Sequence, residues 1–365
     1  MVQVPLKDYS YANARVRAMS ARLLEPHVYR ELLEAPDYNQ ALAVLENTEY
    51  GPDIEHFMLE GARPTTIDRA FNRNLVRTFS KIKEFFIGRP EELVNALLAR
   101  WDPYNLKTIL RGMRALVPKA EITRNLVPIG AIDLVTLEEI VGQPDLRASI
   151  DAMVVLGREW PIPYGRAVMA NLAEYLHEHD LSVLELALDR FHYQELGKIL
   201  EGKDADTALV REVMVMEVDA VNIATLMRIC GLELKEFRAE DYFVPGGTIG
   251  DAGEFAKIMS LGQPEQVYER LSHRMPYKDA LAGAWKAFEE RGESVFEDEM
   301  QKHIIKTCLK MSKDPLGIGV IIDFMWRKYL EITNLRIIVR GKSIGLIESQ
   351  IRKELLLFGE EQKGG

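Results

Sequence analysis

The sequence predicts an all-α protein built from three repeated helical domains. Apolar side chains recur at helical spacing along almost the whole chain, and clusters of glycine and proline separate these segments. One polar motif also returns three times, at intervals of roughly 115 residues, which is a normal domain size. The short apolar runs lack the two-residue alternation and the Asn-Gly turns of β-hairpins. We therefore expect helices and no strands.

The helical spacing is clearest in three segments. Each places leucine, isoleucine or methionine three or four positions apart, so that these side chains share one face of a helix. The segments are Leu93, Leu97 and Leu98; Leu106, Ile109, Leu110 and Met113; and Ile321, Met325 and Leu330.

Two of the turn clusters occur twice, which indicates an internal repeat. Val127-Pro128 and Val244-Pro245 lie 117 positions apart. Gly142-Gln143-Pro144 returns 120 positions later as Gly262-Gln263-Pro264. Such self-similarity at a fixed interval is the signature of a repeated structural unit.

A motif of an acid, an asparagine three residues later and an arginine six residues after that marks each copy. Apolar residues follow each asparagine at its first, fourth and fifth positions, and another aspartate precedes it by 33 to 37 residues. The three copies are Asp102, Asn105 and Arg111; Asp219, Asn222 and Arg228; and Glu331, Asn334 and Arg340, with upstream Asp68, Asp189 and Asp298. The predicted domains are residues 1–125, with an N-terminal segment, 126–245 and 246–365.

The motif has a structural and a functional interpretation. The acid and the asparagine share a helix face, whereas the arginine is turned away by about 240°, so the three cannot converge on one small ligand. In the structural interpretation the asparagine bonds a helix end or a loop, and the arginine pairs with a carboxylate. In the functional one, the basic residues contact a partner. The candidates for contact or bracing are Lys107, Arg111, Arg228, Arg336 and Arg340.

The first copy differs from the others at its start. Asp102-Pro103 suggests an N-cap followed by proline in the first helical turn, whereas the other two helices are expected to continue unbroken through the motif.

Charge and composition exclude several classes of protein. The 365 residues carry a net charge of −10, which disfavours sequence-independent binding to nucleic acid. Cys230 and Cys308 are the two cysteines, and both lie in apolar helical patterns, so we expect buried thiols in a reducing compartment. The N-terminus lacks the apolar core of a secretion signal. A membrane-spanning helix needs about 20 mostly apolar residues, and we expect none.

The catalytic and ligand motifs that can be found are incomplete. Gly341-Lys342-Ser343 ends like a phosphate-binding loop, but its first glycine is replaced by Arg336 and no strand precedes it. The glycine-rich residues 245–250 read as a turn between domains. His177 and His179 stand two apart, which would separate them by about 200° around a helix and disfavours a shared metal. Glu138-Glu139 and residues 297–299 read as solvated helix faces. We expect no catalytic residue, metal or cofactor.

Four groups of residues form a recognisable set: the opening Tyr9-x-Tyr11-Ala12-Asn13-Ala14-Arg15-Val16-Arg17, the segment Trp101-Asp102-Pro103-Tyr104-Asn105-Leu106-Lys107, the Val-Pro-x-Gly boundaries, and the closing Asn334-Leu335-Arg336-x-Ile338-x-Arg340-Gly341-Lys342. Together they resemble a known family, the C subunit of the V-type (A-type) ATP synthase and ATPase, which is similar to the d subunit of the eukaryotic pump. The resemblance covers the whole chain.

This resemblance implies a non-catalytic part of a rotary motor for ATP synthesis and ion transport. Its members are helical funnels with pseudo-threefold symmetry in the central stalk, peripheral to the membrane at its cytoplasmic face. They connect the central shaft, formed by the D and F subunits, to the rotor ring of proteolipid subunits that transports protons or sodium, and they bind no nucleotide directly.

Two other classes of function remain as alternatives to the resemblance. One is a free-standing helical-repeat scaffold that binds a peptide or protein partner, although repeats of 115 residues are longer than those of common α-solenoids. The other is a helical hydrolase whose metal is held by scattered acids and histidines.

Overall fold

Every regular element in the part of the chain that the structure describes is a helix, which confirms the predicted all-α class. The computed structural model describes residues 9–356, apart from residues 60, 62, 158–159, 161–162, 231–238 and 292–294. The chain divides into two compact units, residues 1–91 with 308–365 and residues 92–307. It passes between them within α6 (Arg89–Leu98) and at the end of α19 (Val295–Cys308).

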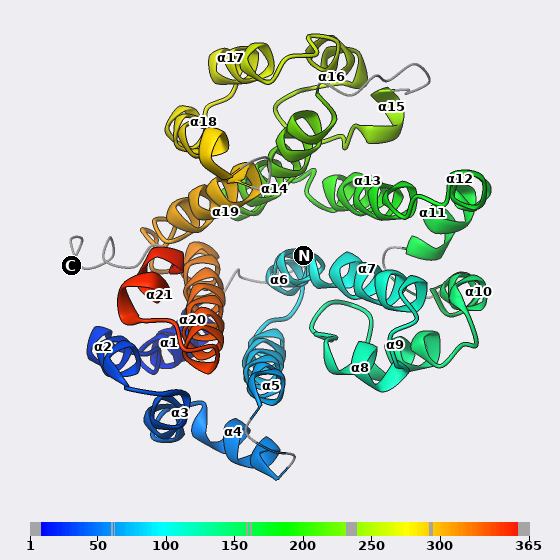
Figure 1. The fold of residues 1–365 in the computed structure, drawn as a ribbon. Coiled ribbons are helices and arrows are strands. Elements are labelled where there is room, and N and C mark those ends of the chain that lie inside the picture. Colours follow the sequence, from blue (N-terminus) through cyan, green and yellow to red (C-terminus); the bar gives the residue numbers. More distant parts are fainter. Residues whose placement is uncertain are drawn as a thin grey trace, which may run out of the picture. The chain divides into compact units, whose positions relative to one another are not determined.

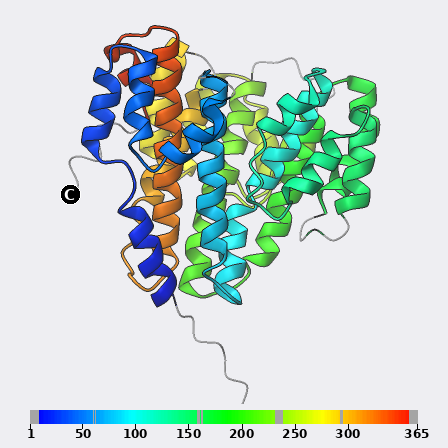
Figure 2. The ribbon, with the colours of Figure 1, turned by 90° about the horizontal axis from the view of Figure 1, so that it is seen from below.

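The first unit combines the two ends of the chain. Its elements are α1 (Ser10–Ser20), α2 (Pro26–Glu34), α3 (Tyr38–Glu46), α4 (Gly51–Met58), α5 (Pro64–Lys83), α20 (Gly319–Ser343) and α21 (Glu348–Glu354). The long helix α20 packs against α1, α3, α5 and α21, and Figure 2 shows α1 in dark blue beside α20 in orange. Early and late helices therefore depend on each other for burial of their apolar faces.

The second unit contains two successive groups of helices. The first group is α7 (Trp101–Arg114), α8 (Lys119–Arg124), α9 (Leu134–Val141), α10 (Leu146–Leu156), α11 (Tyr164–Ala170), α12 (Leu172–Glu178) and α13 (Ser182–Ile199). The second is α14 (Ala205–Ile229), α15 (Ala239–Tyr242), α16 (Ala252–Met259), α17 (Pro264–Arg274), α18 (Lys278–Arg291) and α19. Figure 1 labels them in chain order.

Aspartate begins five of these helices. In each case the helix starts where a side-chain oxygen accepts a hydrogen bond from the backbone N–H three residues later. The caps are Asp37 of α3, Asp133 of α9, Asp145 of α10, Asp204 of α14 and Asp251 of α16. In α2, α4, α5 and α17, proline in the first turn marks the start instead. Aspartate and proline in the sequence thus mark where these helices begin.

The three motif asparagines make the same pair of hydrogen bonds. Asn105 donates through Nδ2 to the carbonyl of Val127 and accepts at Oδ1 from its N–H, both at 2.8 Å. Asn222 bonds Val244 in the same way, at 2.8 and 2.9 Å, and Asn334 bonds Leu356 at 3.0 and 2.8 Å. The partner is 22 residues further along the chain in every copy. We call this arrangement the asparagine clasp; it confirms that the asparagines bond loops.

The motif acids hold neighbouring loops through backbone N–H groups. Asp102 accepts from Ala131 and Ile132, both at 3.0 Å, and Asp219 accepts from Thr248 at 2.7 Å. Glu331 accepts from Leu24 at 2.5 Å and from the Tyr50 hydroxyl at 2.7 Å. In the third copy, therefore, the acid at the C-terminal end of the sequence holds a segment from the N-terminal end.

Two glycines permit the close approach of these loops to their acids. A Cβ atom on Gly130 would lie 2.1 Å from Oδ1 of Asp102, and one on Gly247 would lie 2.3 Å from Oδ1 of Asp219. Both contacts are impossibly short, so a carboxylate takes the space that any other side chain would fill. This requirement explains the two Val-Pro-x-Gly sequences, of which the glycine is part.

The predicted cap at Asp102 is wrong. Helix α7 begins at Trp101, and its N-cap residue is Arg100, so Asp102 already lies in the first turn. Its carboxylate is buried and accepts hydrogen bonds from the backbone of Ala131 and Ile132. The break before α7 does exist, and α14 and α20 run unbroken through their motifs as expected. Cys308 is buried as predicted, whereas Cys230 is half-buried.

We predict that Asn222→Ala will destabilise the fold by about 2–6 kcal/mol. The substitution leaves the buried N–H and C=O of Val244 without partners, and each unsatisfied group costs about 1–3 kcal/mol. Chemical denaturation measures the loss. The matched control is Asn125→Ala, which removes an exposed side chain bonded to the carbonyl of Glu121 in its own turn. Equal effects of the two substitutions would contradict the clasp as a major source of stability.

Candidate functional site

All five candidate basic residues pair with an acid on another helix. Lys107 lies 2.5 Å from Asp189, and the guanidinium of Arg111 makes two hydrogen bonds of 2.6 Å to Glu185; both acids are on α13. Arg228 of α14 bonds Glu297 of α19 at 2.8 Å. The predicted pairing of the motif arginines with carboxylates is therefore confirmed. Whether these residues also contact a partner stays a prediction.

The third copy makes the corresponding pairs in the first unit. Arg340 of α20 bonds Asp68 of α5 at 2.5 Å, and Arg336 lies 3.7 Å from the other oxygen of Asp68 and also bonds Asn72. Asp68 and Asp189, named from the sequence as upstream acids, thus pair with a basic residue. Asp298 does not fill this role: it is exposed, and its neighbour Glu297 bonds Arg228.

Each acid lies on a helix that comes before one motif helix in the sequence but pairs with a different motif helix. Helix α13 precedes α14 but pairs with α7, and α19 precedes α20 but pairs with α14. Helix α5 precedes the first motif and pairs with the last one, on α20. The sequence spacing pointed to the acids but not to these partners, because nothing in the spacing says which copy an acid will meet.

A groove of about 510 Å³ in the second unit collects three of these pairs. It runs between α7, α13, α14 and α19, and its lining includes Lys107, Arg111 and Arg228. The side chains of Arg111 and Arg228 are 64% and 60% exposed, although both are ion-paired. The hydrogen bonds to Glu185 raise the pKa of Arg111 above its usual value, so this charge is permanent. The groove therefore presents paired charges to solvent.

Less exposed charges also line this groove. Arg100 lies 2.6 Å from Glu217, and burial raises the pKa of Glu217 while Arg100 and Tyr193 oppose that rise. Burial also raises the pKa of Asp189, against the opposing charge of Lys107. Breaking a buried pair on one side costs about 3–5 kcal/mol, so these contacts hold α7, α13 and α14 in place.

His192 of α13 is a buried histidine next to these charges. Its Nδ1 lies 2.8 Å from the hydroxyl of Tyr164 on α11, and the residue is 1% exposed. Burial, with the nearby cations Lys107 and Arg100, lowers the pKa of His192 to about 3. The imidazole is therefore neutral at physiological pH. No sequence pattern distinguishes this residue, because a lone histidine on a helix has no characteristic spacing.

The incomplete motifs have structural roles. Lys342 donates to the carbonyls of Leu33 and Ala35, at 2.7 and 2.5 Å, and so caps the C-terminus of α2 rather than holding a phosphate. Residues 246–250 form the loop that bonds Asp219. Helix α12 ends at Glu178, and His179 is its left-handed C-cap. Within the described ranges no cluster of three metal-ligating side chains occurs, and every helix is too short or too polar to cross a bilayer.

The fold and motif define the class of protein: a helical subunit with three clasped motif helices and paired surface charges. The chain belongs to the ATP synthase (C/AC39) subunit family, whose sequence model matches residues 12–354. As a member, it is a structural component of an ATP synthase and not one of its catalytic subunits.

Curated relatives extend over almost the full chain. The chain is 29% identical to the C subunit of the V-type ATP synthase of Deinococcus radiodurans, over 95% of this chain and 91% of that protein. It is 28% identical to the C subunit of the A-type ATP synthase of Methanococcoides burtonii, over 96% of this chain and 94% of that protein. The corresponding protein of Methanocaldococcus jannaschii is 26% identical, over 97% and 87%.

We predict that His192→Gln will flatten the dependence of stability on pH. A histidine whose folded pKa is lowered stabilises the fold above its unfolded pKa of about 6.5, and this stability is lost as the pH falls towards 3. Between pH 7 and pH 5 the wild type should lose about 2 kcal/mol that the variant retains. Asp189 and Glu217 have the opposite sign, because their raised pKa values favour the fold as pH falls.

Denaturation at several pH values measures the difference in stability between the wild type and His192→Gln. Asp189 and Glu217 are present in both proteins, so their contributions cancel in this comparison. His177→Gln is the control, because His177 is exposed on α12. Parallel pH profiles for the wild type and His192→Gln would refute the assignment.

Proposed function

We propose that the chain is a non-catalytic central-stalk subunit that couples the shaft, formed by the D and F subunits, to the membrane rotor ring. In this role it links ion transport, of protons or sodium, to ATP synthesis or hydrolysis, from the cytoplasmic face of the membrane. The observation that carries the proposal is the family match over residues 12–354. Membership of an ATP synthase disfavours the free-standing scaffold and the metal-dependent hydrolase.

The internal structure suits the transmission of torque. Torque requires helices that do not slide past one another, and the clasps and buried ion pairs fix the motif helices against their neighbours. We propose that the three motif regions are equivalent repeats, cut near residues 125 and 245, that surround a funnel with pseudo-threefold symmetry. The shaft would enter this funnel, and the rotor ring would hold its other face. The three matching clasps support this equivalence.

The exposed arginines are the proposed shaft contacts. An exposed ion pair contributes about 0–1 kcal/mol to folding, so little stability is lost when the arginine turns to a new partner. Charges at the rim of an interface mainly speed association and make it depend on salt. Arg111, Arg228 and Arg340 meet this description, since each is at least 60% exposed in its pair. Lys107 and Arg336 are more buried and suit bracing.

We predict that Arg111→Gln, Arg228→Gln and Arg340→Gln will each weaken binding to the D–F shaft without a large change in melting temperature. Binding should fall most at low salt, and the difference between two salt concentrations should shrink, because a long-range attraction has been removed.

The matched control is Arg147→Gln. Arg147 is an exposed arginine that pairs with Asp151 within its own helix α10, away from the groove. A large fall in melting temperature with normal shaft binding would leave the three arginines as internal braces only.

We also predict that the isolated chain binds neither ATP nor ADP specifically. Lys342 is engaged by two carbonyls at the end of α2, and Gly341 lies inside helix α20 instead of in a phosphate-binding loop. Titration calorimetry checks this, with Lys342→Gln as a comparison. Saturable binding at micromolar nucleotide that disappears in Lys342→Gln would contradict the assignment.

A further inference from the structure

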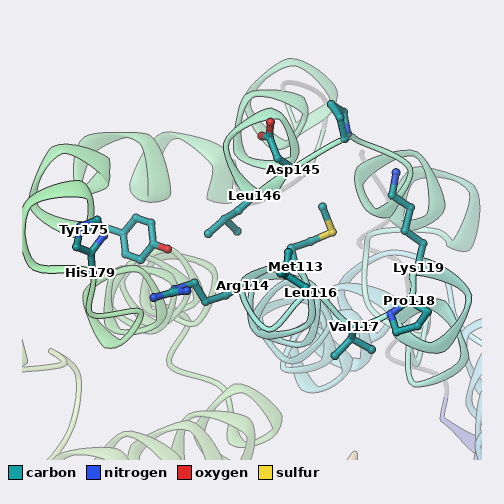
Figure 3. Close-up of a pocket in the computed structure, with 11 residues that line it drawn as sticks. Met113, Arg114, Leu116, Val117, Pro118, Lys119, Asp145, Leu146, Tyr175 and His179 are labelled. Atoms are coloured by element: carbon teal, nitrogen blue, oxygen red, sulfur yellow. The ribbon is translucent and has the colours of Figure 1, made fainter.

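Two residues other than glycine have a positive φ in the part of the chain that the structure describes, and both line one groove. Leu116 has a φ of 56° and His179 has a φ of 58°. The groove has a volume of about 730 Å³ and lies in the second unit, where the ends of α7 and α12 meet the start of α10 (Figure 3). Left-handed backbone at side-chain-bearing residues is unfavourable and gathers at functional sites.

The backbone conformation at the end of α7 would be more favourable for glycine than for the leucine at position 116. The N–H of Val117 bonds the carbonyl of Gly112 at 2.9 Å, and the N–H of Leu116 bonds Met113, which makes a Schellman turn with its left-handed residue at Leu116. The end of α20 forms the same turn, with Leu346 bonded to Gly341, but its left-handed residue is Gly345. Both residues stand eleven positions after their motif asparagine. Folding alone therefore does not explain the leucine.

Leu116 is also displayed to solvent. It is 89% exposed, so its side chain adds almost nothing to the core while its backbone remains unfavourable. The lining of the groove also includes four apolar residues, here called its floor: Met113, Val117, Leu146 and Tyr175. Figure 3 shows Leu146 and the Tyr175 ring directed into the space between α7, α10 and α12. A side chain entering the groove would contact these residues and Leu116 together.

The rim of the groove is basic, although the chain has a net charge of −10. Arg114 is exposed, has no ion pair with any described carboxylate, and extends towards Tyr175 and His179 in Figure 3. Lys119 stands at the opposite side, where its ammonium donates to the carbonyl of Gly142. The one carboxylate of the lining, Asp145, is bonded to the backbone of Ala148 as a helix cap. The uncompensated charge is therefore positive.

We propose that this groove is a docking site for an acidic, apolar segment of another protein subunit of the ATP synthase. The apolar side chains of that segment fill the floor and contact Leu116, and a carboxylate of the segment pairs with Arg114. The leucine is kept in an unfavourable conformation because a glycine would remove the contact. Docking here requires only assembly with other subunits, so it does not depend on the coupling role.

Photocrosslinking in the purified, assembled ATP synthase tests the proposal. Benzoylphenylalanine is introduced in place of Leu116, and in a control in place of Leu59, which is 95% exposed at the end of α4 in the other unit. The expected result is an adduct from position 116 with one protein subunit, at a segment that carries apolar and acidic residues. Position 59 should not give this adduct.

Charge variants make the test specific to this groove. Arg114→Glu should reduce the yield of the adduct several-fold, and Arg114→Lys should retain most of it. An adduct with lipid, no adduct, or a yield that ignores the charge at position 114 would overturn the proposal.

The variant Leu116→Gly separates folding from docking. It should melt at the same temperature as the wild type or higher, because glycine relieves the backbone, yet be lost several-fold more readily from the complex at high salt. A lower melting temperature would show that Leu116 serves the fold, and unchanged retention would show that it takes no part in docking.

Discussion

The asparagine clasp is the contact on which the rest of the structure depends. A single side chain satisfies both backbone groups of a residue 22 positions away, so each motif helix is fastened to the segment that follows it. Once the helix is fixed, its acid can meet the next loop only where glycine leaves room, as at Gly130 and Gly247. The clasp also fixes the opposite helix face, from which the motif arginine reaches the acidic helix. One buried side chain therefore positions both the motif helix and the segment that follows it.

The two faces of each motif helix differ in how costly their contacts are to break. Buried contacts of the clasp and of pairs such as Arg100–Glu217 are costly to break, because their groups cannot return to water. The exposed pairs of Arg111 and Arg228 cost little to exchange. A subunit that transmits force needs both properties at once: a body that does not deform and a surface whose charges can be shared with a partner. The separation by about 240° around the helix provides them without conflict.

The fold class and many contacts of the motif residues could be predicted from the sequence. The predictions that were wrong or missing have physical causes. The helical class, the loop bonds of Asn105, Asn222 and Asn334, and the pairing of each motif arginine with some carboxylate could be predicted from spacing around a helix. The pairing of Arg340 with Asp68 could not be predicted in this way. The spacing of residues within one copy does not say which other copy that copy contacts. The cap predicted at Asp102 was wrong. An aspartate before proline usually caps its own helix, whereas the carboxylate of Asp102 accepts hydrogen bonds from a loop. Leu116 could have been noticed by aligning it with Gly345, eleven residues after the asparagine.

Coupling itself is the central claim, and ATP-driven ion transport in inverted membrane vesicles tests it most directly. Vesicles carrying ATP synthase that lacks this chain should still hydrolyse ATP, since the chain has no catalytic role. They should not transport ions, because the shaft is then no longer joined to the ring, and adding the purified chain should restore transport in proportion to the amount bound. Normal ATP-driven transport in vesicles that lack the chain would contradict the account.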